Sequence, residues 1–248
     1  MKIFLCIDDT DNIDSKGTGE IAQDLASLIE SIGWGTCSSI TRHQLLVHPD
    51  VPYTSHNSSM CFTADINSEY LDETIEAAIK ILETESAEGS DPGLCVFIPD
   101  RLSQHQQQQL IAFGLRAKQE VLTKQEAYDL AEALSLHLSE HGGTGQGVIG
   151  ALAGVGLRLT GNDGRFKGQH KLHSDKKVVT VAEILGETAI DLVRTPAGFI
   201  LHEEELITLG EKLKSVFLNH QSVLLVESVA VEGEMQWVPC AGRALKQY

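Results

Sequence analysis

Residues 1–11 read MKIFLCIDDTD, an apolar run that ends abruptly in three acids. The run from Met1 to Ile7 consists mainly of β-branched, aromatic and aliphatic side chains, which predicts a short buried strand. Asp8, Asp9 and Asp11 therefore follow the carboxyl end of a strand. In open α/β sheets this edge is where ligands bind, so we expect a ligand site here.

The three carboxylates predict a metal-nucleotide site, because at this spacing they cannot avoid repelling one another. A hard divalent cation such as Mg²⁺ takes one or two carboxylates together with phosphate oxygens of a substrate. The alternative is a plain turn, in which one Asp bonds to its own backbone and the others are solvated. A turn needs only one of the acids, so we favour the cation.

The length of 248 residues allows one domain or two of ordinary size, and we expect two. A hydrophobic content of 42% and a charged content of 22% are typical of globular proteins. The apolar runs are too short for a signal peptide or a membrane span, which needs about 20 residues, so we expect a cytoplasmic protein. Five scattered cysteines indicate buried free thiols rather than disulfides or a zinc site.

The net charge of −16 argues against nucleic acid as the main partner, because such proteins usually carry a basic footprint. The segment from Arg158 to Lys177 reverses the sign, with six basic and two acidic residues. A local basic patch suits a small anion such as a nucleotide phosphate. An ordinary solvated face is the alternative.

Apolar residues at helical spacing predict a helix from Gly19 to Ile32, and Thr18 stands where a hydroxyl can cap it. Later patterns predict strands within 37–47, 60–66 and 94–98, and helices over 68–82, 103–118 and 123–140. Towards the end of the chain we expect strands near 178–184 and 223–231, a helix over 203–218 and a last strand through Trp237.

Residues 142–150 read GGTGQGVIG and contain the pattern GxGxxG at Gly145, Gly147 and Gly150. A dinucleotide fingerprint needs a strand directly before it, whereas residues 131–140 look helical, so a Rossmann site is not expected. The glycines still let backbone N–H groups approach an anion, and the next helix start adds partial positive charge. Close packing of two helices is the alternative.

Two further groups of residues suggest ligands. Arg165 and Lys167 lie among glycines and form a basic loop that could close over phosphates. His137 and His141 are four apart on the expected helix, where two imidazoles can share a metal. No third ligand is evident, however, and the dipole at a helix C-terminus favours cations without any metal.

Several segments together resemble the amino-terminal half of archaeal tRNA-isoleucine agmatinylcytidine synthetases. The segments are Ile7 to Asp11, Thr18 in its Gly-Thr-Gly setting, Pro52-Tyr53, Asp91-Pro92-Gly93 and Gly147 to Gly156. The resemblance implies an α+β fold of mixed α/β character. In this fold a kinase-like, ATP-binding α/β domain carries an inserted ferredoxin-like domain. We assign residues 1–48 and 141–248 to the kinase-like domain and 49–140 to the insert, whose strand and helix order is compatible with a split βαβ module.

The resemblance also implies a chemistry. Members of that family use ATP to phosphorylate a cytosine carbonyl oxygen in the tRNA anticodon, and agmatine then displaces the phosphate. Their acidic motif binds Mg²⁺ and nucleotide, which corresponds to Asp8, Asp9 and Asp11 here. A loop threonine that becomes phosphorylated corresponds to Thr18. The family continues into an OB-fold and a zinc ribbon that grip tRNA, and this sequence contains neither, so tRNA modification by this chain alone is the least expected activity.

The sequence hypothesis is therefore an ATP- and Mg²⁺-dependent phosphotransferase or ligase-type enzyme that acts on an unidentified substrate, with small molecules among the candidates. Asp8, Asp9, Thr18 and Lys167 are the expected catalytic residues, and Asp8, Asp9 and Asp11 the metal ligands. Gly145, Gly147, Gly150 and Arg165 are expected to bind the nucleotide phosphates. The alternative is a non-catalytic nucleotide sensor, or a subunit that works with a separate RNA-binding protein. The sequence leaves self-association open.

Overall fold

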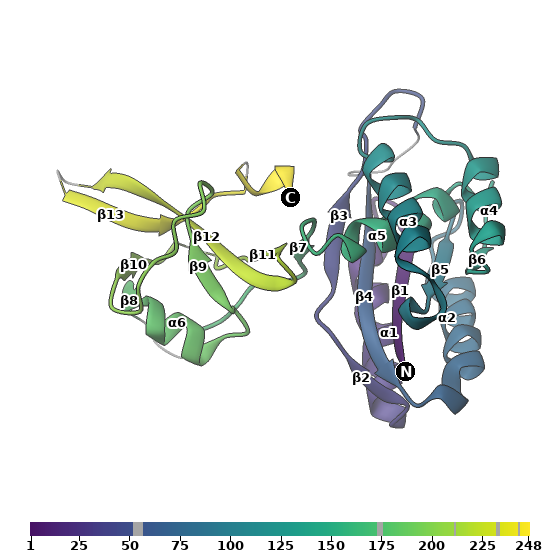
Figure 1. Cartoon of the computed structure of the whole chain (residues 1–248), viewed down its shortest axis with the longest axis horizontal. Helices are drawn as coiled ribbons and strands as arrows, with labels where there is room; N and C mark the ends of the chain where they lie inside the picture. Colours follow the sequence, from purple (N-terminus) through teal and green to yellow (C-terminus); the bar gives the residue numbers. More distant parts are fainter. Residues whose placement is uncertain (52–56, 173–175, 211, 232–233, 243) are drawn as a thin grey trace. The chain divides into compact units, whose positions relative to one another are not determined.

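The computed structural model has a mixed α+β fold, as expected, and describes every residue except 52–56, 173–175, 211, 232–233 and 243 (Figure 1). The chain forms two compact units, Met1–Thr160 and Gly161–Tyr248, hereafter unit 1 and unit 2. Among the described residues, no helix combines the length and the apolar character that crossing a membrane requires.

Unit 1 is built on an antiparallel sheet with β1 at its centre. The strands, in spatial order, are β6 (His137–Glu140), β5 (Gly93–Phe97), β1 (Lys2–Asp8), β4 (Ser58–Ile66) and β3 (Thr41–Gln44), and β2 (Gly35–Cys37) also pairs with β4. Cys6 lies opposite Cys61 on one side and Cys95 on the other. The central position explains why β1 is buried from its second residue onward.

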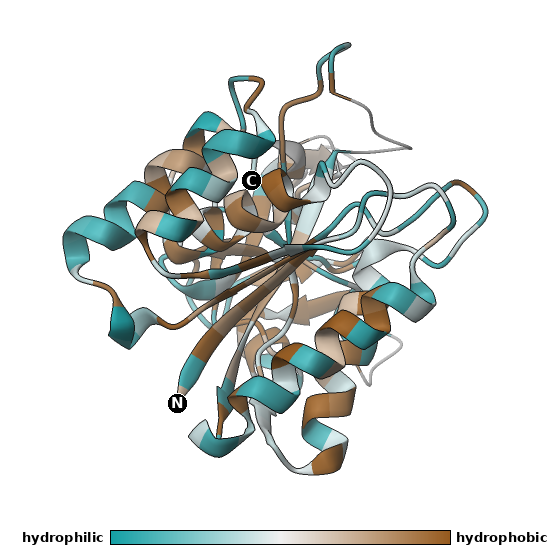
Figure 2. Cartoon of the chain, turned by 90° about the vertical axis from the view of Figure 1, so that its right-hand side faces the viewer, coloured by the Kyte–Doolittle hydropathy of each residue, from teal (hydrophilic) through white to brown (hydrophobic). Residues whose placement is uncertain are grey.

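The side chains of β1 alternate between two cores, as the period of a strand requires. Ile3, Leu5 and Ile7 pack with helices α1 (Thr18–Ile32) and α2 (Leu71–Glu85). Phe4 and Cys6 pack on the opposite face with helices α3 (Gln104–Arg116), α4 (Lys124–Ala133) and α5 (Gly147–Leu159). Figure 2 shows this arrangement as apolar colour on the strands and on the inner sides of the helices. Short 3₁₀ helices η1 (Ser68–Tyr70) and η2 (Pro99–Arg101) complete the unit.

Helix α1 confirms the expected helix and its end. Ile21, Leu25 and Ile29 are buried at helical spacing, and Gly33 ends the helix with φ +80°. Thr18 does not cap the helix, which was one of the two roles left open for it, because Gly17 holds the cap position and no side chain bonds there. Thr18 is the first helical residue instead, and its hydroxyl is used elsewhere.

The helix expected over 123–140 is shorter in the structure. Helix α4 ends at Ala133, Ser135 adopts φ +54°, and residues 137–140 form β6 against β5. His137 and His141 are therefore not on one helix, which corrects that prediction. A strand does precede the glycine-rich segment, contrary to our expectation, although it runs antiparallel to its neighbour rather than parallel as in dinucleotide-binding folds.

The compact units divide at residues 160 and 161, whereas the sequence analysis placed domain boundaries at 48/49 and 140/141. Strands β4 and β5 fall inside the range assigned to the insert, yet both pair with β1. The physical reason is that β1 is buried, so the backbone N–H and C=O groups along both of its edges need hydrogen-bond partners, which residues 58–66 and 93–97 supply. The kinase-like and ferredoxin-like assignments stay predictions.

Unit 2 is also built mainly from β-strands. Its strands, in spatial order, are β7 (Arg165–Phe166), β11 (Val216–Leu218), β12 (Gln221–Val231), β13 (Glu234–Pro239), β10 (Leu206–Thr208) and β8 (Val178–Thr180), and β9 (Leu192–Arg194) also pairs with β12. Helix α6 (Val181–Glu187) follows β8, and η3 (Ala244–Gln247) lies near the end. Asn219 and His220, both at positive φ, form the tight turn between β11 and β12.

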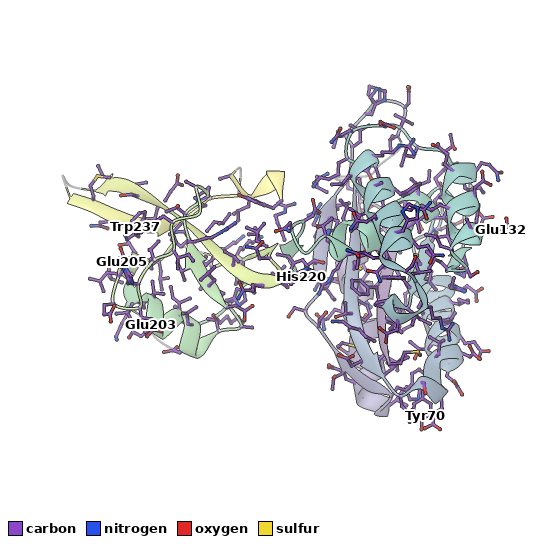
Figure 3. All side chains as sticks on the ribbon, viewed as in Figure 1. Tyr70, Glu132, Glu203, Glu205, His220 and Trp237 are labelled. Atoms are coloured by element: carbon purple, nitrogen blue, oxygen red, sulfur yellow. The ribbon has the colours of Figure 1, made fainter. Side chains whose placement is uncertain are left out.

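Two expectations for unit 2 are wrong. Residues 203–218 contain strands β10 and β11 rather than a helix, and residues 181–184 belong to α6 rather than to a strand. Side-chain contacts between elements distant in sequence account for part of this arrangement. Trp237 on β13 donates from Nε1 to Glu205 Oε1 at 3.1 Å, beside β10 (Figure 3).

Candidate functional site

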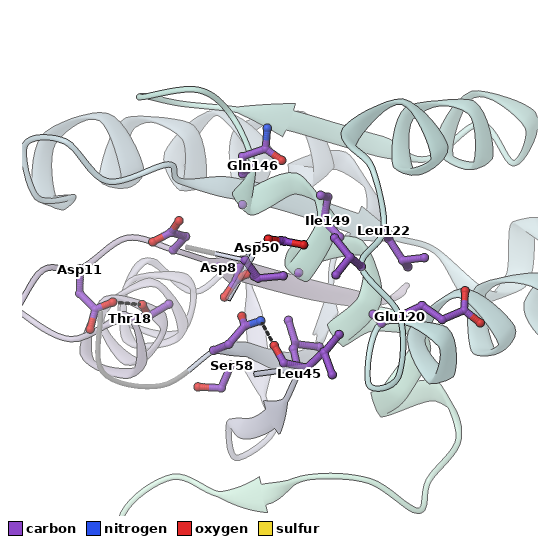
Figure 4. A pocket seen from close by; sticks show the side chains of 18 residues that line it. Asp8, Asp11, Thr18, Leu45, Asp50, Ser58, Glu120, Leu122, Gln146 and Ile149 are labelled. Carbon is purple, nitrogen blue, oxygen red and sulfur yellow. Dashed lines mark hydrogen bonds between the residues drawn. The ribbon is translucent and has the colours of Figure 1, made fainter. Parts of the chain in front are cut away.

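An open cavity in unit 1 brings together two segments that the sequence analysis had selected separately. Asp8, Asp9, Asp11 and Thr18, from the loop after β1, line it (Figure 4). Gly147 and Gly150, from the first turn of α5, line the same cavity. We call residues 8–18 the acid loop and residues 142–156 the glycine segment.

The acid loop leaves the sheet through an unusual backbone conformation. Asp9 adopts φ +51°, in the left-handed region that Asp and Asn tolerate better than most residues. The turn lets the chain leave the sheet directly after β1. The backbone N–H of Ala87 donates to the carbonyl of Thr10 at 2.9 Å, which ties the loop to the segment before β5.

Thr18 takes part in a hydrogen-bonded chain rather than in helix capping. Its Oγ1 donates to Asp11 Oδ1 at 3.1 Å and accepts from Thr10 Oγ1 at 3.0 Å. Thr18 is 5% exposed and Thr10 is fully buried. The arrangement fixes both the hydroxyl and the Asp11 carboxylate at the cavity wall (Figure 4).

The acids of this site repel one another in a poorly hydrated place. The pKa of Asp8 is raised well above its ordinary value, first by burial and then by the charge of Asp9, with a smaller effect of Asp11. Burial, followed by the charges of Asp91 and Asp11, raises the pKa of Asp9 to about 6. Both shifts show that the structure stabilises these carboxylates poorly when they are charged.

Positive charge is missing from this part of the described structure. The described residues that line the cavity include no Lys or Arg. Nor does any described Lys, Arg or His form an ion pair with Asp8, Asp9 or Asp11. No group of three or more His, Cys, Asp or Glu side chains in the described part is arranged to hold a metal ion alone. A cation bound by these acids would therefore take further ligands from a partner molecule, such as phosphate oxygens.

The glycine segment packs closely against its surroundings. A β-carbon on Gly150 would overlap the Asp8 carboxylate, and one on Gly154 would overlap Cys6 Sγ and Ser59 Oγ. A β-carbon on Gly156 would overlap the backbone carbonyl of Leu110 in α3. The glycines thus let α5 approach the sheet on one side and α3 on the other. Helix packing was one of the two interpretations left open by the sequence.

Gly145 differs from the other two glycines of the pattern, because it is not among the cavity-lining residues. It adopts φ +76°, and its N–H donates to Gly142 O at 3.2 Å and Asp91 Oδ1 at 3.3 Å. A β-carbon there would overlap Glu140 Oε2, a carboxylate paired with Lys124 at 2.7 Å. Its N–H group is thus already bonded within the protein.

The remaining candidates belong to other segments of the chain. Arg165 and Lys167 belong to unit 2, and their role at the phosphates stays a prediction. Burial lowers the pKa of the half-buried Arg165 guanidinium. His137 and His141 each bond to the hydroxyl of Ser139, at 2.9 and 2.8 Å. The Pro52-Tyr53 segment lies outside the described residues.

Sequence reasoning missed the apolar wall of the cavity. This wall comes from three separate segments and consists of Leu45, Leu46, Val51, Val121, Leu122 and Ile149 (Figure 4). Except for Ile149, which belongs to the glycine segment, these residues lie in segments without a recognisable motif. The one local signal was the end of a predicted strand near Leu45. The cavity therefore has a charged part and an apolar part.

Comparisons with known proteins agree with the resemblance. No family model matches the sequence. Over 140 residues the chain is 29% identical to TiaS of Pyrococcus horikoshii, a 2-agmatinylcytidine synthetase that acts on an isoleucine tRNA. This match covers 53% of the chain and 31% of that protein.

Solved structures of TiaS share the fold. Apo TiaS matches with a TM-score of 0.52 and 22% identity, over 63% of this chain and 35% of that chain. The complex of TiaS with its isoleucine tRNA and ATP matches with a TM-score of 0.53 and 22% identity, over 63% of this chain and 36% of that chain. The complex with the same tRNA, AMPCPP and agmatine matches with a TM-score of 0.53 and 20% identity, over 70% of this chain and 42% of that chain. The match thus spans about a third of the length of these relatives, and the chain contains a TiaS-like region with a mixed α+β fold.

Proposed function

We propose that unit 1 binds ATP with Mg²⁺ in the cavity and phosphorylates a substrate, as a phosphotransferase or a ligase-type enzyme. The observation that carries this proposal is the uncompensated charge of Asp8, Asp9 and Asp11 in a cavity that also has an apolar wall. A metal-bound nucleotide has the same two parts, a charged triphosphate and a flat apolar base. Solved structures named as TiaS complexes with ATP and AMPCPP lend support.

The donor set fits a magnesium ion that shares its coordination with phosphate. Asp8, Asp9 and Asp11 offer oxygen ligands, which Mg²⁺ prefers, and a nucleotide would supply the others. When bound there, the ion would neutralise phosphate charge and orient the terminal phosphate. The apolar side chains around Leu45 and Leu122 would exclude water from the base. Because no described lining residue is basic, nucleotide affinity in unit 1 depends on the ion.

In this proposal Thr18 accepts a phosphoryl group. In the proposed step Thr18 Oγ1 attacks the terminal phosphorus of ATP, the bond from that phosphorus to the bridging oxygen breaks, and ADP leaves. The hydroxyl proton passes to Asp11 Oδ1, which already accepts the hydrogen bond from Thr18. The phosphate would then move to the final acceptor. In the alternative, Thr18 only orients Asp11 and the acceptor attacks ATP directly.

The test is transfer of labelled phosphate from ATP in the presence of Mg²⁺. We expect Asp8→Asn to lower transfer about 100-fold, because the bound Mg²⁺ would lose one of its charged ligands, which costs several kcal/mol. Asp72→Asn, on the exposed side of α2, is the matched control and should retain full activity. Label on Thr18 that disappears in Thr18→Val assigns the acceptor. Absence of nucleotide binding by the unmutated chain would contradict the proposal.

A nucleotide sensor, or a subunit of a larger assembly, is the second candidate. It is favoured by charge, because unit 1 has 9 basic and 23 acidic residues and unit 2 has 10 and 12, which leaves net charges of −14 and −2. Such surfaces disfavour binding of tRNA by this chain alone. Tight ATP binding without any product would identify the sensor.

A further inference from the structure

The turn before β5, residues 90–93, lies between the two segments of the site but has no role in the chemistry proposed above. We propose that Asp91 in this turn is a positioning residue, which fastens residues 142–147 and the first turn of α5 beside the acid loop. The inference rests on the proposed function, which supplies the ligand, ATP with Mg²⁺. Whether Asp91 holds these residues in place can nevertheless be measured without any ligand.

Asp91 makes four hydrogen bonds to the glycine segment. Its Oδ1 accepts from the backbone N–H groups of Thr144 and, at 3.3 Å, Gly145. Its Oδ2 accepts from Thr144 Oγ1 at 2.7 Å. Its backbone carbonyl accepts from the N–H of Gly147 at 3.1 Å. Asp91 therefore accepts hydrogen bonds from three backbone N–H groups and one hydroxyl. Three of these donors belong to Thr144 and Gly145, just before α5, and the fourth is the N–H of Gly147, its first residue.

The backbones on the two sides of this contact are in close approach. A β-carbon on Gly93 would overlap the backbone of Gly147, and a β-carbon on Gly147 would overlap the carbonyl of Asp91. Pro92 O accepts from the N–H of His141 at 2.8 Å. This proximity leaves the glycine segment one position relative to the turn, and the Asp91 carboxylate holds it there.

The same turn is also joined to the acid loop. Ser90 donates from its N–H and its hydroxyl to Ala87 O, at 3.1 and 2.7 Å, and the N–H of Ala87 donates to Thr10 O. Residues 87–91 thus connect the acid loop to the glycine segment. Asp91 itself is not among the described residues that line the cavity. Loss of the Asp91 carboxylate would free Gly147 and Gly150 to move relative to Asp8.

The hydrogen bonds predict which variants retain the fastening. In Asp91→Asn the side-chain oxygen still accepts from both N–H groups, and the amide can donate to Thr144 Oγ1, because a hydroxyl both donates and accepts. Asp91→Ala removes all three side-chain bonds and leaves backbone donors unsatisfied. A positioning role therefore predicts rescue by Asn. A role for the negative charge itself predicts that Asn and Ala fail alike.

Amide hydrogen exchange tests the fastening without nucleotide. We expect the Thr144 and Gly145 amides to exchange about tenfold faster in Asp91→Ala, the ratio for a hydrogen bond of about 1.4 kcal/mol, and at nearly the unmutated rate in Asp91→Asn. Ser103→Ala is the matched control, because it removes a helix cap from α3 in the same unit without touching this segment. Its Thr144 and Gly145 amides should keep their protection. Unchanged exchange in Asp91→Ala would overturn the inference.

Calorimetry with AMPCPP and Mg²⁺ then connects the fastening to the site. We expect Asp91→Ala to weaken binding about tenfold, and Asp91→Asn and Ser103→Ala to bind within about threefold of the unmutated chain. Equal weakening by Asp91→Ala and Ser103→Ala would show a general loss of stability and contradict positioning. If the unmutated chain binds no nucleotide, the proposed function fails. The exchange rates then test by themselves whether Asp91 holds residues 142–147 in place.

Discussion

The acid loop and the glycine segment meet at one cavity, but only the acid loop carries an electrostatic cost. Asp8 and Asp9 hold charge that burial and their neighbours disfavour. Gly154 and Gly156 carry no such cost, because their missing side chains make room for Cys6, Ser59 and Leu110. The first pattern indicates a ligand, whereas most of the second is explained by packing.

Gly150 is where the two patterns coincide. It lines the cavity and at the same time makes room for the carboxylate of Asp8. The comparison teaches that a glycine-rich motif is ambiguous until each position is examined against its neighbours. Buried acids without counter-charges are less ambiguous, because no packing advantage offsets their repulsion.

Gly156→Ala gives the largest expected effect, and it tests the packing half of the comparison. The added methyl group meets the backbone of Leu110, which cannot rotate away as a side chain could. We expect the free energy of unfolding in urea to fall by about 3 kcal/mol, the upper end of the usual cost of overpacking. A loss below about 1 kcal/mol would mean that α5 has room to shift.

Gly150→Ala should affect stability and binding together. The methyl group meets the Asp8 carboxylate, so we expect about 2 kcal/mol of destabilisation. Displacement of Asp8 should also weaken Mg²⁺-dependent AMPCPP binding about tenfold in calorimetry. Gly154→Ala is the matched control, because it overlaps Cys6 and Ser59, which are not among the described lining residues. It should cost similar stability and leave affinity unchanged. Equal losses of affinity would remove the distinction between the two glycines.

The pH dependence of stability tests whether charged acids in the acid loop destabilise the fold. Burial raises the pKa of Asp9 from 3.8 to about 6, so the folded state binds this proton more tightly than the unfolded state. The resulting stabilisation is complete below about pH 4 and is lost as the pH rises through about 6. After allowing for screening of this partly exposed group, we expect a loss of about 1 to 2 kcal/mol.

Asp9→Asn supplies the reference for that measurement, because Asn also tolerates the positive φ of this position. Both proteins are unfolded in urea between about pH 4 and a pH above 6. As the pH rises, the free energy of unfolding of the unmutated protein should fall relative to that of Asp9→Asn. Mg²⁺ with AMPCPP should reduce the loss in the unmutated protein. Parallel stability profiles would show that Asp9 is not destabilised by its neighbours.

Gly186→Ala gives the smallest expected effect and calibrates the method. Nothing lies within 4 Å of a β-carbon at this exposed position of α6. Alanine has the better helix propensity, so we expect unit 2 to gain about 0.5 to 1 kcal/mol of stability, seen as a higher thermal midpoint. A destabilised variant would show that glycine substitutions in this chain carry costs beyond local overlap.

Local signals allowed part of this structure to be predicted. The buried apolar run of β1, the apolar stripe of α1 and its end at Ile32 are encoded in neighbouring residues, and each prediction is confirmed. The convergence of Asp8 with Gly147 and Gly150 at one cavity was expected as well. The type of side chain and its position after a strand were sufficient, because both depend on short-range chemistry.

The errors have a common physical origin in contacts between distant residues. Leu134 and Leu138 fit a helical stripe, but the chain turns at Ser135 and residues 137–140 pair with β5. Thr18 stands where a hydroxyl can cap α1, yet its hydroxyl bonds to Asp11 and Thr10. Most of the apolar wall of the cavity comes from segments without a motif. These outcomes depend on tertiary partners, which local spacing does not specify.

The most direct test of the central claim is calorimetric titration of the unmutated chain with AMPCPP, first with Mg²⁺ and then with a chelator. If Asp8, Asp9 and Asp11 hold the ion that neutralises the phosphates, binding will be measurable with Mg²⁺ and will weaken about 100-fold or more when the ion is removed. Equal affinity with and without the divalent ion, or no binding in either case, would contradict the account.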